Sequence, residues 1–170
     1  WSADPWTGCS DVDECLIATP LGNALRESVR RWACDEGVTP YDQRAQVGLL
    51  RHVVTRVGVH TDQALVNIVT APGAEEVVDL LADRLRTDCP QLVGLVHSVN
   101  AGVAEVTGGL PNRTVWGQDF IEERIHDVTL RLSAGAFFQT NTRMAERLYE
   151  RAAEAAGLTC DEVLYHLYAG

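Results

Sequence analysis

The chain has 170 residues, of which 46% are hydrophobic and 22% are charged, values typical of a globular domain rather than of a disordered or collagen-like chain. Its 24 acidic side chains outnumber its 14 basic ones, all of them arginine, so the formal net charge is −10. Non-specific nucleic-acid binding depends on Lys and Arg contacts to phosphate. The chain is therefore a poor candidate for such binding, although the sequence does not exclude a local face of arginine side chains. It has no run of about 18 apolar residues, so no membrane-spanning segment is expected.

The N-terminal residues and the cysteines bear on compartment and metal content. Residues 1–6 lack a basic stretch followed by an apolar one, so no secretory signal is expected, and the start without Met indicates the middle of a longer chain. The cysteines are scattered, and none forms a Cys-x-x-Cys pair, which argues against a zinc site and predicts free thiols. They are Cys9, Cys15, Cys34, Cys89 and Cys160.

Residues 1–19 show no periodicity and are predicted to form an irregular leader. After them, apolar residues recur at helical spacing in three stretches and at strand spacing in several others. Helices are predicted over 21–35, 74–86 and 144–156. Strands are predicted over 48–58, 64–69, 92–99, 115–125, 128–132 and 162–168.

These elements predict an α+β fold with a mixed sheet and helices packed on it. Strands 48–58 and 64–69 are expected to form an antiparallel hairpin that buries Leu50, Val53 or Val54, and Val57 against the helix 74–86. That helix lies between two strands in the sequence, which suits a right-handed crossover connection. Helix 144–156 is amphipathic, with Met144 and Leu148 on its apolar side.

Five segments in order along residues 14–170 carry a resemblance to a known family. Phe137-Phe138-Gln139-Thr140-Asn141 precedes a helix, and Val163–Gly170 is an apolar run that ends in glycine. Three earlier segments agree with the same pattern: 48–56, which includes Leu-Arg-His, 65–70, and 96–100, which ends in Asn. Together they resemble the RNA uracil-C5 methyltransferases of the RumA/TrmA type.

The resemblance implies a reaction and a division into domains. In that family, S-adenosylmethionine donates a methyl group to C5 of a uridine in tRNA or rRNA, after a cysteine has added to C6, and an acidic residue then removes the C5 proton. Residues 20–135 resemble the central α+β domain. Residues 136–170 resemble the beginning of a Rossmann-like methyltransferase domain that is truncated after its first helix and strand. The positions of the family's nucleophile and base lie beyond Gly170, so no catalytic residue is expected in this chain.

Two residues match family positions near the methyl donor. Gln139 matches the glutamine of a Phe-x-Gln-x-Asn motif, and its amide both donates and accepts hydrogen bonds; the competing interpretation is a loop-capping amide. Tyr168 matches an aromatic residue at the end of the family's strand, although it is also explained as a core aromatic. The two residues predict only a partial S-adenosylmethionine site, since the glycine-rich loop and the acidic ribose ligand are absent from the chain.

Other residues are interpreted more conservatively. Cys15 resembles the fourth ligand of an iron–sulfur cluster found in some family members, but the other three ligands are missing, so a free, half-buried thiol is expected and a cluster is not. Arg51 either faces RNA or lies on a solvated strand face, and His52 next to it is expected on the opposite face. His97 and His126 show no metal-ligand spacing. Glu122 and Glu123 are adjacent on a predicted strand, so their side chains should diverge.

Two functions from different classes follow. The first is a fragment of an S-adenosylmethionine-dependent RNA uracil-C5 methyltransferase whose catalytic half is missing; the intact Phe137–Asn141 motif favours it. The second is a non-catalytic descendant that serves in a ribonucleoprotein assembly; His166 and Ala169, where the family usually has Asp and Cys or Ser, favour it. The expected partner is RNA, and residues 158–170 are expected to be either covered by a partner protein or poorly ordered. The expected location is the cytoplasm or an organelle (chloroplast or mitochondrion).

Overall fold

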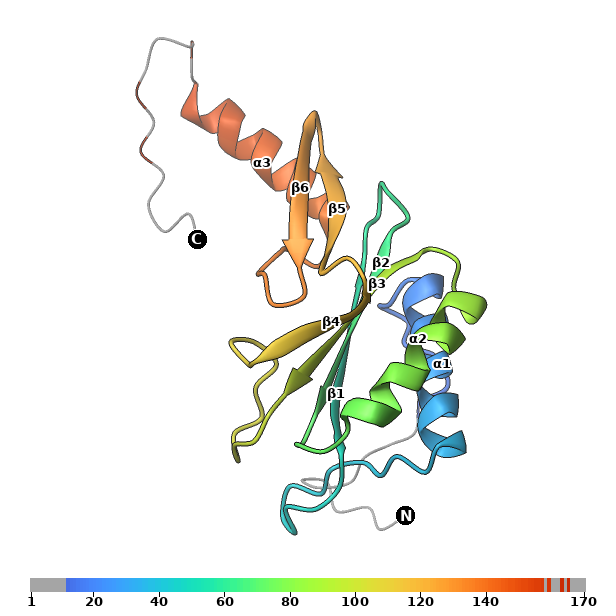
Figure 1. Ribbon diagram of the computed structural model, residues 1–170. Helices are drawn as coiled ribbons and strands as arrows, with labels where there is room; N and C mark the ends of the chain where they lie inside the picture. The colour runs from blue at the N-terminus through green and yellow to red at the C-terminus, as the bar shows by residue number, and fades with distance from the viewer. Residues whose placement is uncertain (1–11, 158, 160–162, 164, 166–170) are drawn as a thin grey trace.

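The computed structural model describes residues 12–157, 159, 163 and 165. Three helices and six strands follow one another along this part of the chain (Figure 1). Their bounds are α1 Pro20–Asp35, β1 Leu50–Val57, β2 Ala64–Thr70, α2 Glu75–Asp88, β3 Leu92–Val99, β4 Asn112–Gly117, β5 Phe120–Ile125, β6 Val128–Ser133 and α3 Thr142–Ala156.

Four of the strands form a mixed sheet in the order β1-β2-β3-β4, and β5 pairs with β6 in a separate hairpin. The β1–β2 and β3–β4 pairs are antiparallel, whereas β2 and β3 are parallel and are joined through α2. The α+β fold with a mixed sheet and the antiparallel hairpin of β1 and β2 are thus confirmed. The stretch 115–125 divides between β4 and β5, which belong to different sheets.

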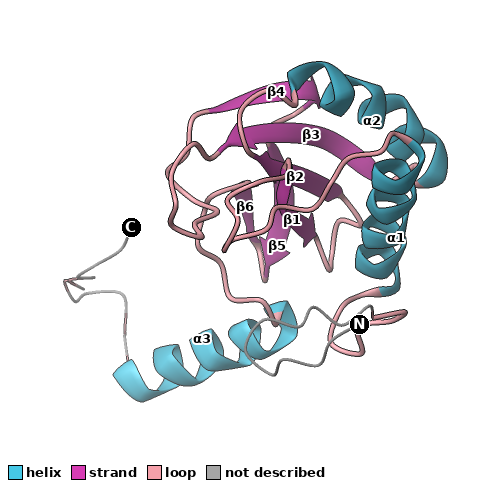
Figure 2. Ribbon diagram, turned by 90° about the horizontal axis from the view of Figure 1, so that it is seen from below, coloured by secondary structure: helices cyan, strands magenta, loops and turns pink. Residues whose placement is uncertain are grey.

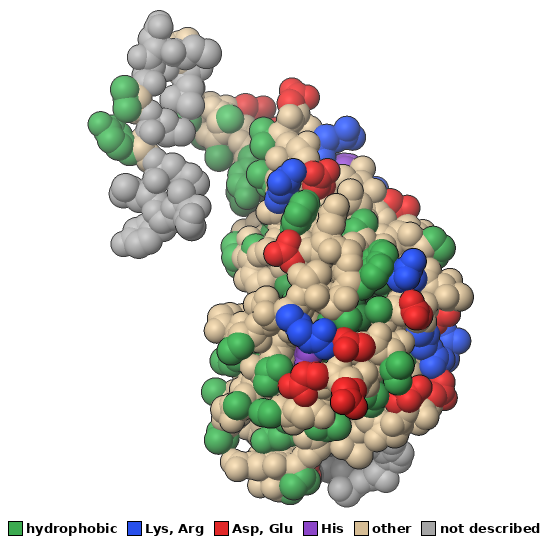
Figure 3. Space-filling model, viewed as in Figure 1, with side chains coloured by type: hydrophobic (Ala, Val, Ile, Leu, Met, Phe, Trp, Pro, Cys, Tyr) green, Lys and Arg blue, Asp and Glu red, His purple; other side chains and the backbone are tan. Residues whose placement is uncertain are grey.

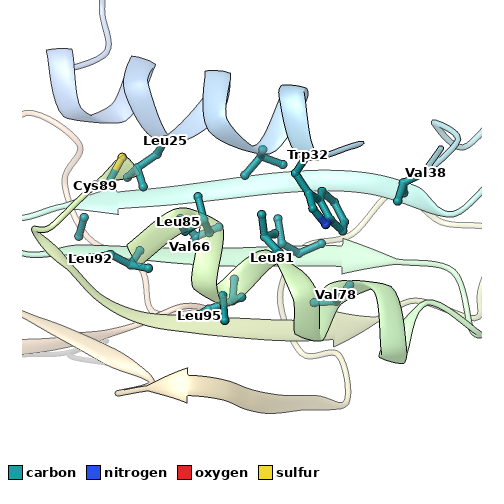
Figure 4. Packing of buried hydrophobic residues seen from close by; sticks show 14 of the residues in the cluster. Leu25, Trp32, Val38, Val66, Val78, Leu81, Leu85, Cys89, Leu92 and Leu95 are labelled. Carbon is teal, nitrogen blue, oxygen red and sulfur yellow. The ribbon is translucent and has the colours of Figure 1, made fainter. Parts of the chain in front are cut away.

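Helices α1 and α2 lie side by side on one face of the four-stranded sheet, and the main core fills the space between them and the strands (Figures 1 and 2). Figure 4 shows Leu25 and Trp32 of α1 and Leu81 and Leu85 of α2 converging on β2 and β3. All four are at most 1% exposed. Removing each from water stabilises the fold by roughly 1.5–3 kcal/mol.

The helix that covers β1 differs from the expectation. Leu50, Val53 and Val57 are half-buried against the main core as predicted, but α1 rather than α2 lies on β1. Because α2 connects β2 to β3, it lies over β3 and β4, and it leaves the area above β1 to α1. Val54 takes the other face of the sheet, where it pairs with Asn67.

The β5–β6 hairpin packs on the opposite face of the sheet, at one end of it, and forms a second hydrophobic cluster. Its buried members are Leu65 and Val96 from the sheet and Ile121 and Leu132 from the hairpin. Helix α3 follows the hairpin and lies beside it, away from the main sheet (Figures 1 and 2). The hairpin therefore joins α3 to the rest of the molecule.

Sequence signals account for both ends of α3. The Asn141 side chain accepts a hydrogen bond from the Met144 amide at 3.1 Å, and Gly157 ends the helix with a φ of 59°. Within α3, only Thr142 and Ala145 are buried. Its predicted apolar side is therefore largely uncovered by the described residues; Met144 and Leu148, for example, are more than half exposed.

Of the strand predicted over 162–168, only Val163 and Tyr165 are described, and both are exposed. Tyr168, His166 and Ala169 lie outside the described residues, as does most of the predicted leader. Among the helices that are described, none is long and apolar enough to cross a bilayer.

Candidate functional site

The Phe137–Asn141 motif lies in the loop between β6 and α3, and Phe138 is its one residue that is not exposed. Phe137 is 87% exposed, whereas Phe138 is half-buried against the second hydrophobic cluster. Gln139 is exposed, and no hydrogen bond within the described residues involves its amide. Asn141, not Gln139, caps the helix. The loop therefore presents the Gln139 amide outward, with its donor and acceptor atoms available.

A small cleft of about 130 Å³ opens beside Gln139, between β1, the hairpin and the start of α3. Phe138 and Thr140 from the motif line it, together with one cation and one carboxylate from distant parts of the chain. Its full lining consists of Arg56, Val57, Ile121, Glu123, Leu132, Phe138, Gln139, Thr140 and Thr142.

The carboxylate of the cleft belongs to Glu123, which is 1% exposed. Its two oxygens accept hydrogen bonds from the Val59 amide at 2.6 Å, the His60 amide at 3.1 Å and the Arg124 amide at 2.8 Å. The Thr142 hydroxyl donates a fourth bond at 3.2 Å. Such charge-assisted bonds compensate for burying a carboxylate. Glu123 thereby ties the β1–β2 turn, β5 and the first turn of α3 together.

The cation of the cleft is Arg56, which projects from β1 on the face of the sheet opposite the helices. Its Nε donates to the carbonyl oxygen of Ala134 at 3.1 Å, and its Nη2 donates to the carbonyl oxygen of Ala136. Burial lowers the pKa of the Arg56 guanidinium, because the protonated form loses solvation. Arg56 therefore neither faces RNA nor lies on a solvated strand face, the two interpretations given for Arg51; it contacts the loop that leads into the motif.

Arg51 itself has a structural role, so both its RNA-facing and its solvated interpretations are wrong. Its side chain is 1% exposed and forms an ion pair with Glu105 at 2.7 Å. It also donates to several carbonyl oxygens of residues 100–104 and lies 4.3 Å from the centre of the Tyr41 ring. His52, expected on the opposite face, also reaches Glu105 at 2.5 Å, because the pairing of β1 with β2 is irregular between Leu50 and His52.

The remaining candidates stay outside the cleft. His97 is buried and its Nε2 lies 2.8 Å from the Thr70 hydroxyl; His126 contacts Glu150 on α3 at 3.7 Å. Cys15 is a half-buried free thiol, and no group of three His, Cys, Asp or Glu side chains in the described part of the chain has the geometry of a metal site.

Glu123 and Arg56 are the two residues of the cleft that the sequence interpretation missed. Glu122 and Glu123 do diverge, but Glu123 points into the protein. The signal for this is the alternation of Ile121, Glu123 and Ile125, which places Glu123 on the apolar face of β5. For Arg56 the sequence contains no comparable signal, since its partners are backbone carbonyls 78 and 80 residues away.

Comparison with known proteins gives consistent matches over most of the chain, although no protein-family model matches it. Residues of this chain are 31% identical over 160 positions to an uncharacterized RNA methyltransferase of Staphylococcus epidermidis and 34% identical over 161 positions to one of Chlorobaculum tepidum. Both alignments cover 94% of this chain, but only 35% and 33% of those relatives.

A solved structure agrees with these matches. The tRNA (uracil-54, C5)-methyltransferase of Pyrococcus abyssi, in complex with S-adenosyl-L-homocysteine, superposes with a TM-score of 0.74 at 29% identity, over 89% of this chain and 36% of that one. The chain thus spans about a third of the length of the relatives that it matches. The ordered motifs, the fold and these matches together show that this chain is similar, over most of its length, to RNA methyltransferases, one of which is a tRNA uracil-C5 methyltransferase.

Proposed function

We propose that the chain is a segment of an S-adenosylmethionine-dependent RNA (uracil-C5) methyltransferase acting on tRNA or rRNA. One observation carries this proposal. Gln139 stands at the edge of a cleft with an exposed amide that caps nothing in the described structure. The Pyrococcus abyssi relative was solved with S-adenosyl-L-homocysteine, which supports a donor of this type.

In this proposal the chain supplies one wall of the methyl-donor site. The Gln139 amide donates to and accepts from polar groups of the donor, which supplies an electrophilic methyl group when bound. Tyr168, outside the described residues, is proposed as a second contact. The nucleophilic cysteine and the base are proposed to lie in the two thirds of the relatives that this chain does not cover. The residues of this chain therefore position the donor rather than react with it.

RNA is the proposed substrate, and its binding is proposed to be specific rather than based on bulk charge. On the face in Figure 3, arginines stand among acidic side chains instead of gathering in one patch. With a net charge of −10, the chain gains little from non-specific contacts to phosphate. The proposed location is the cytoplasm or an organelle, and a protein covering residues 158–170 is the proposed partner.

A chimera tests the proposal. This chain would replace the equivalent third of the Pyrococcus abyssi enzyme, and transfer of labelled methyl groups from S-adenosylmethionine to tRNA and rRNA would be measured. Methyl transfer is expected, and Gln139→Ala should lower kcat/KM by about 10- to 100-fold, the factor for one or two lost polar contacts. Gln118→Ala, at an exposed glutamine outside the cleft, is the matched control and should be neutral.

The alternative function, a non-catalytic descendant in a ribonucleoprotein, predicts a different outcome of the same experiment. A chimera that is folded by circular dichroism and binds tRNA, but transfers no methyl group, would support it. His166 and Ala169, the residues that depart from the family pattern, are then reverted to Asp and Cys. If activity appears only after these reversions, the departures have removed the catalytic function from this sequence.

A further inference from the structure

The segment that carries Gln139 is fixed at both ends by charged side chains from elsewhere in the chain. It runs from Ala134, after β6, to Thr142, at the start of α3. Arg56 of β1 binds the carbonyl oxygens near its beginning, and Glu123 of β5 binds the Thr142 hydroxyl at its end. A loop of this kind, exposed at its centre, is otherwise free to take many conformations.

The contacts of Arg56 serve the backbone of the loop. Two of its N–H groups point to the carbonyl oxygens of Ala134 and Ala136, two residues apart, which matches the fixed fork of a guanidinium. Among the described residues Arg56 makes no ion pair with a carboxylate; Glu123, in the same cleft, is occupied by four N–H and O–H donors. Half-burying this cation is therefore compensated mainly by the two carbonyls of the loop.

A third anchor lies between the two ends. Phe138 packs among the apolar side chains of the second cluster, next to Leu132 and Ile121. Gln139 follows directly, and its direction is thus set by Phe138 on one side and by the Glu123-bound start of α3 on the other. Arg56 sets the path by which the chain reaches Phe138.

We propose that Arg56 is a positioning residue for Gln139: by binding the carbonyl oxygens of Ala134 and Ala136, it holds the loop so that the Gln139 amide faces the methyl donor. The inference rests on the function proposed above. It assigns Arg56 no contact with the donor or with the uridine. The competing role, a direct contact from Arg56 to an RNA phosphate, is an outcome of the test.

The first measurement is amide hydrogen exchange in the 170-residue chain. Arg56→Lys keeps the charge but loses the fork, so exchange over 134–141 should become about tenfold faster, which corresponds to about 1.4 kcal/mol of local stability. Exchange in β2 and β3 should not change. Arg131→Lys is the control, since its side chain is 71% exposed and it contacts neither carbonyl. In Arg56→Ala, a few millimolar guanidinium should restore the slow exchange of the loop.

The second measurement separates positioning from RNA binding. In the chimera, Arg56→Lys should raise the KM for S-adenosylmethionine about tenfold and leave the affinity for tRNA unchanged. Unchanged exchange over 134–141 together with weaker tRNA binding would overturn the proposal in favour of a phosphate contact. If the lysine variant does not fold, exchange of the arginine Nε–H groups is measured in the wild-type chain instead. An Arg56 Nε–H that exchanges as fast as that of exposed Arg131 would contradict the positioning role of Arg56. An inactive wild-type chimera would refute the proposed function and leave the exchange result interpretable.

Discussion

Replacing Glu123 by glutamine should destabilise the chain more than any other substitution on β5 that keeps the size of the side chain. The substitution keeps the size of the side chain and turns one acceptor oxygen into an NH2 group. Glu123 accepts four hydrogen bonds, three of them from backbone amides. The Thr142 hydroxyl is able to rotate away, but at least one of these partly buried backbone N–H groups would then face another donor.

The magnitude follows from these contacts. An unsatisfied buried N–H costs roughly 1–3 kcal/mol, and a hydrogen bond to a charged group contributes about 1.5–3 kcal/mol. The free energy of unfolding should therefore fall by about 2–4 kcal/mol in Glu123→Gln. That loss is a large part of the total of about 5–15 kcal/mol that is usual for a folded protein.

The assay is urea unfolding followed by circular dichroism, with linear extrapolation to water. The neighbouring Glu122→Gln is the control, because Glu122 is 39% exposed and only 3.6 Å from an exposed arginine, and such pairs contribute about 0–1 kcal/mol. The reasoning would be refuted by a loss below about 1 kcal/mol in Glu123→Gln, or by equal losses in the two variants.

Three further predictions concern pH, packing and the activity of the isolated chain. Burial, assisted by Arg113, lowers the pKa of His97 from 6.5. The contribution of His97 to stability is therefore complete above pH 6.5. Below that pH the free energy of unfolding falls by up to about 1.4 kcal/mol per pH unit, because the unfolded chain binds a proton that the folded chain does not. Denaturation between pH 7.5 and 5 should show this slope in the wild type and not in His97→Gln. A Cβ at Gly94 would overlap with the backbone of Gln118, whereas one at Gly108 meets open space, so Gly94→Ala should lower stability by about 3 kcal/mol and Gly108→Ala should be nearly neutral in the same assay. The 170-residue chain alone should transfer no methyl group to tRNA or rRNA and should bind S-adenosylmethionine with a Kd above about 10⁻³ M, because in the proposed function it supplies only one wall of the site. Turnover above background, or a micromolar constant by calorimetry, would contradict this.

The order of the elements was predictable from the sequence because the periodicity of apolar residues is strong. Trp32 and Leu25 repeat at helical spacing, and the apolar strands 64–69 and 92–99 are bounded by turn residues. The assignment of helices to strands was less accessible, since both helices are amphipathic and either one satisfies the apolar side of β1. That choice depends on the connection from β2 through α2 to β3.

The site was predictable only in part. Gln139 and the exposed loop around it follow from the motif, and the structure leaves its amide accessible. The two residues that hold this loop, Arg56 and Glu123, bind backbone groups far away in the sequence. Such partners are not predictable from the type of a side chain. Arg51 shows the same limit: an arginine on a strand looked solvated, but the carbonyls of residues 100–104 enclose it.

Release of tritium from tRNA labelled at C5 of uridine tests the central claim most directly. Methylation at C5 replaces the hydrogen of that carbon, so each methyl group added there releases one label to water. With the chimera described above, we expect tritium release equal to methyl incorporation, and a loss of both in Gln139→Ala but not in Gln118→Ala. Methyl incorporation without tritium release, or neither in a folded chimera that binds tRNA, would contradict the proposed role of this chain in uracil-C5 methylation.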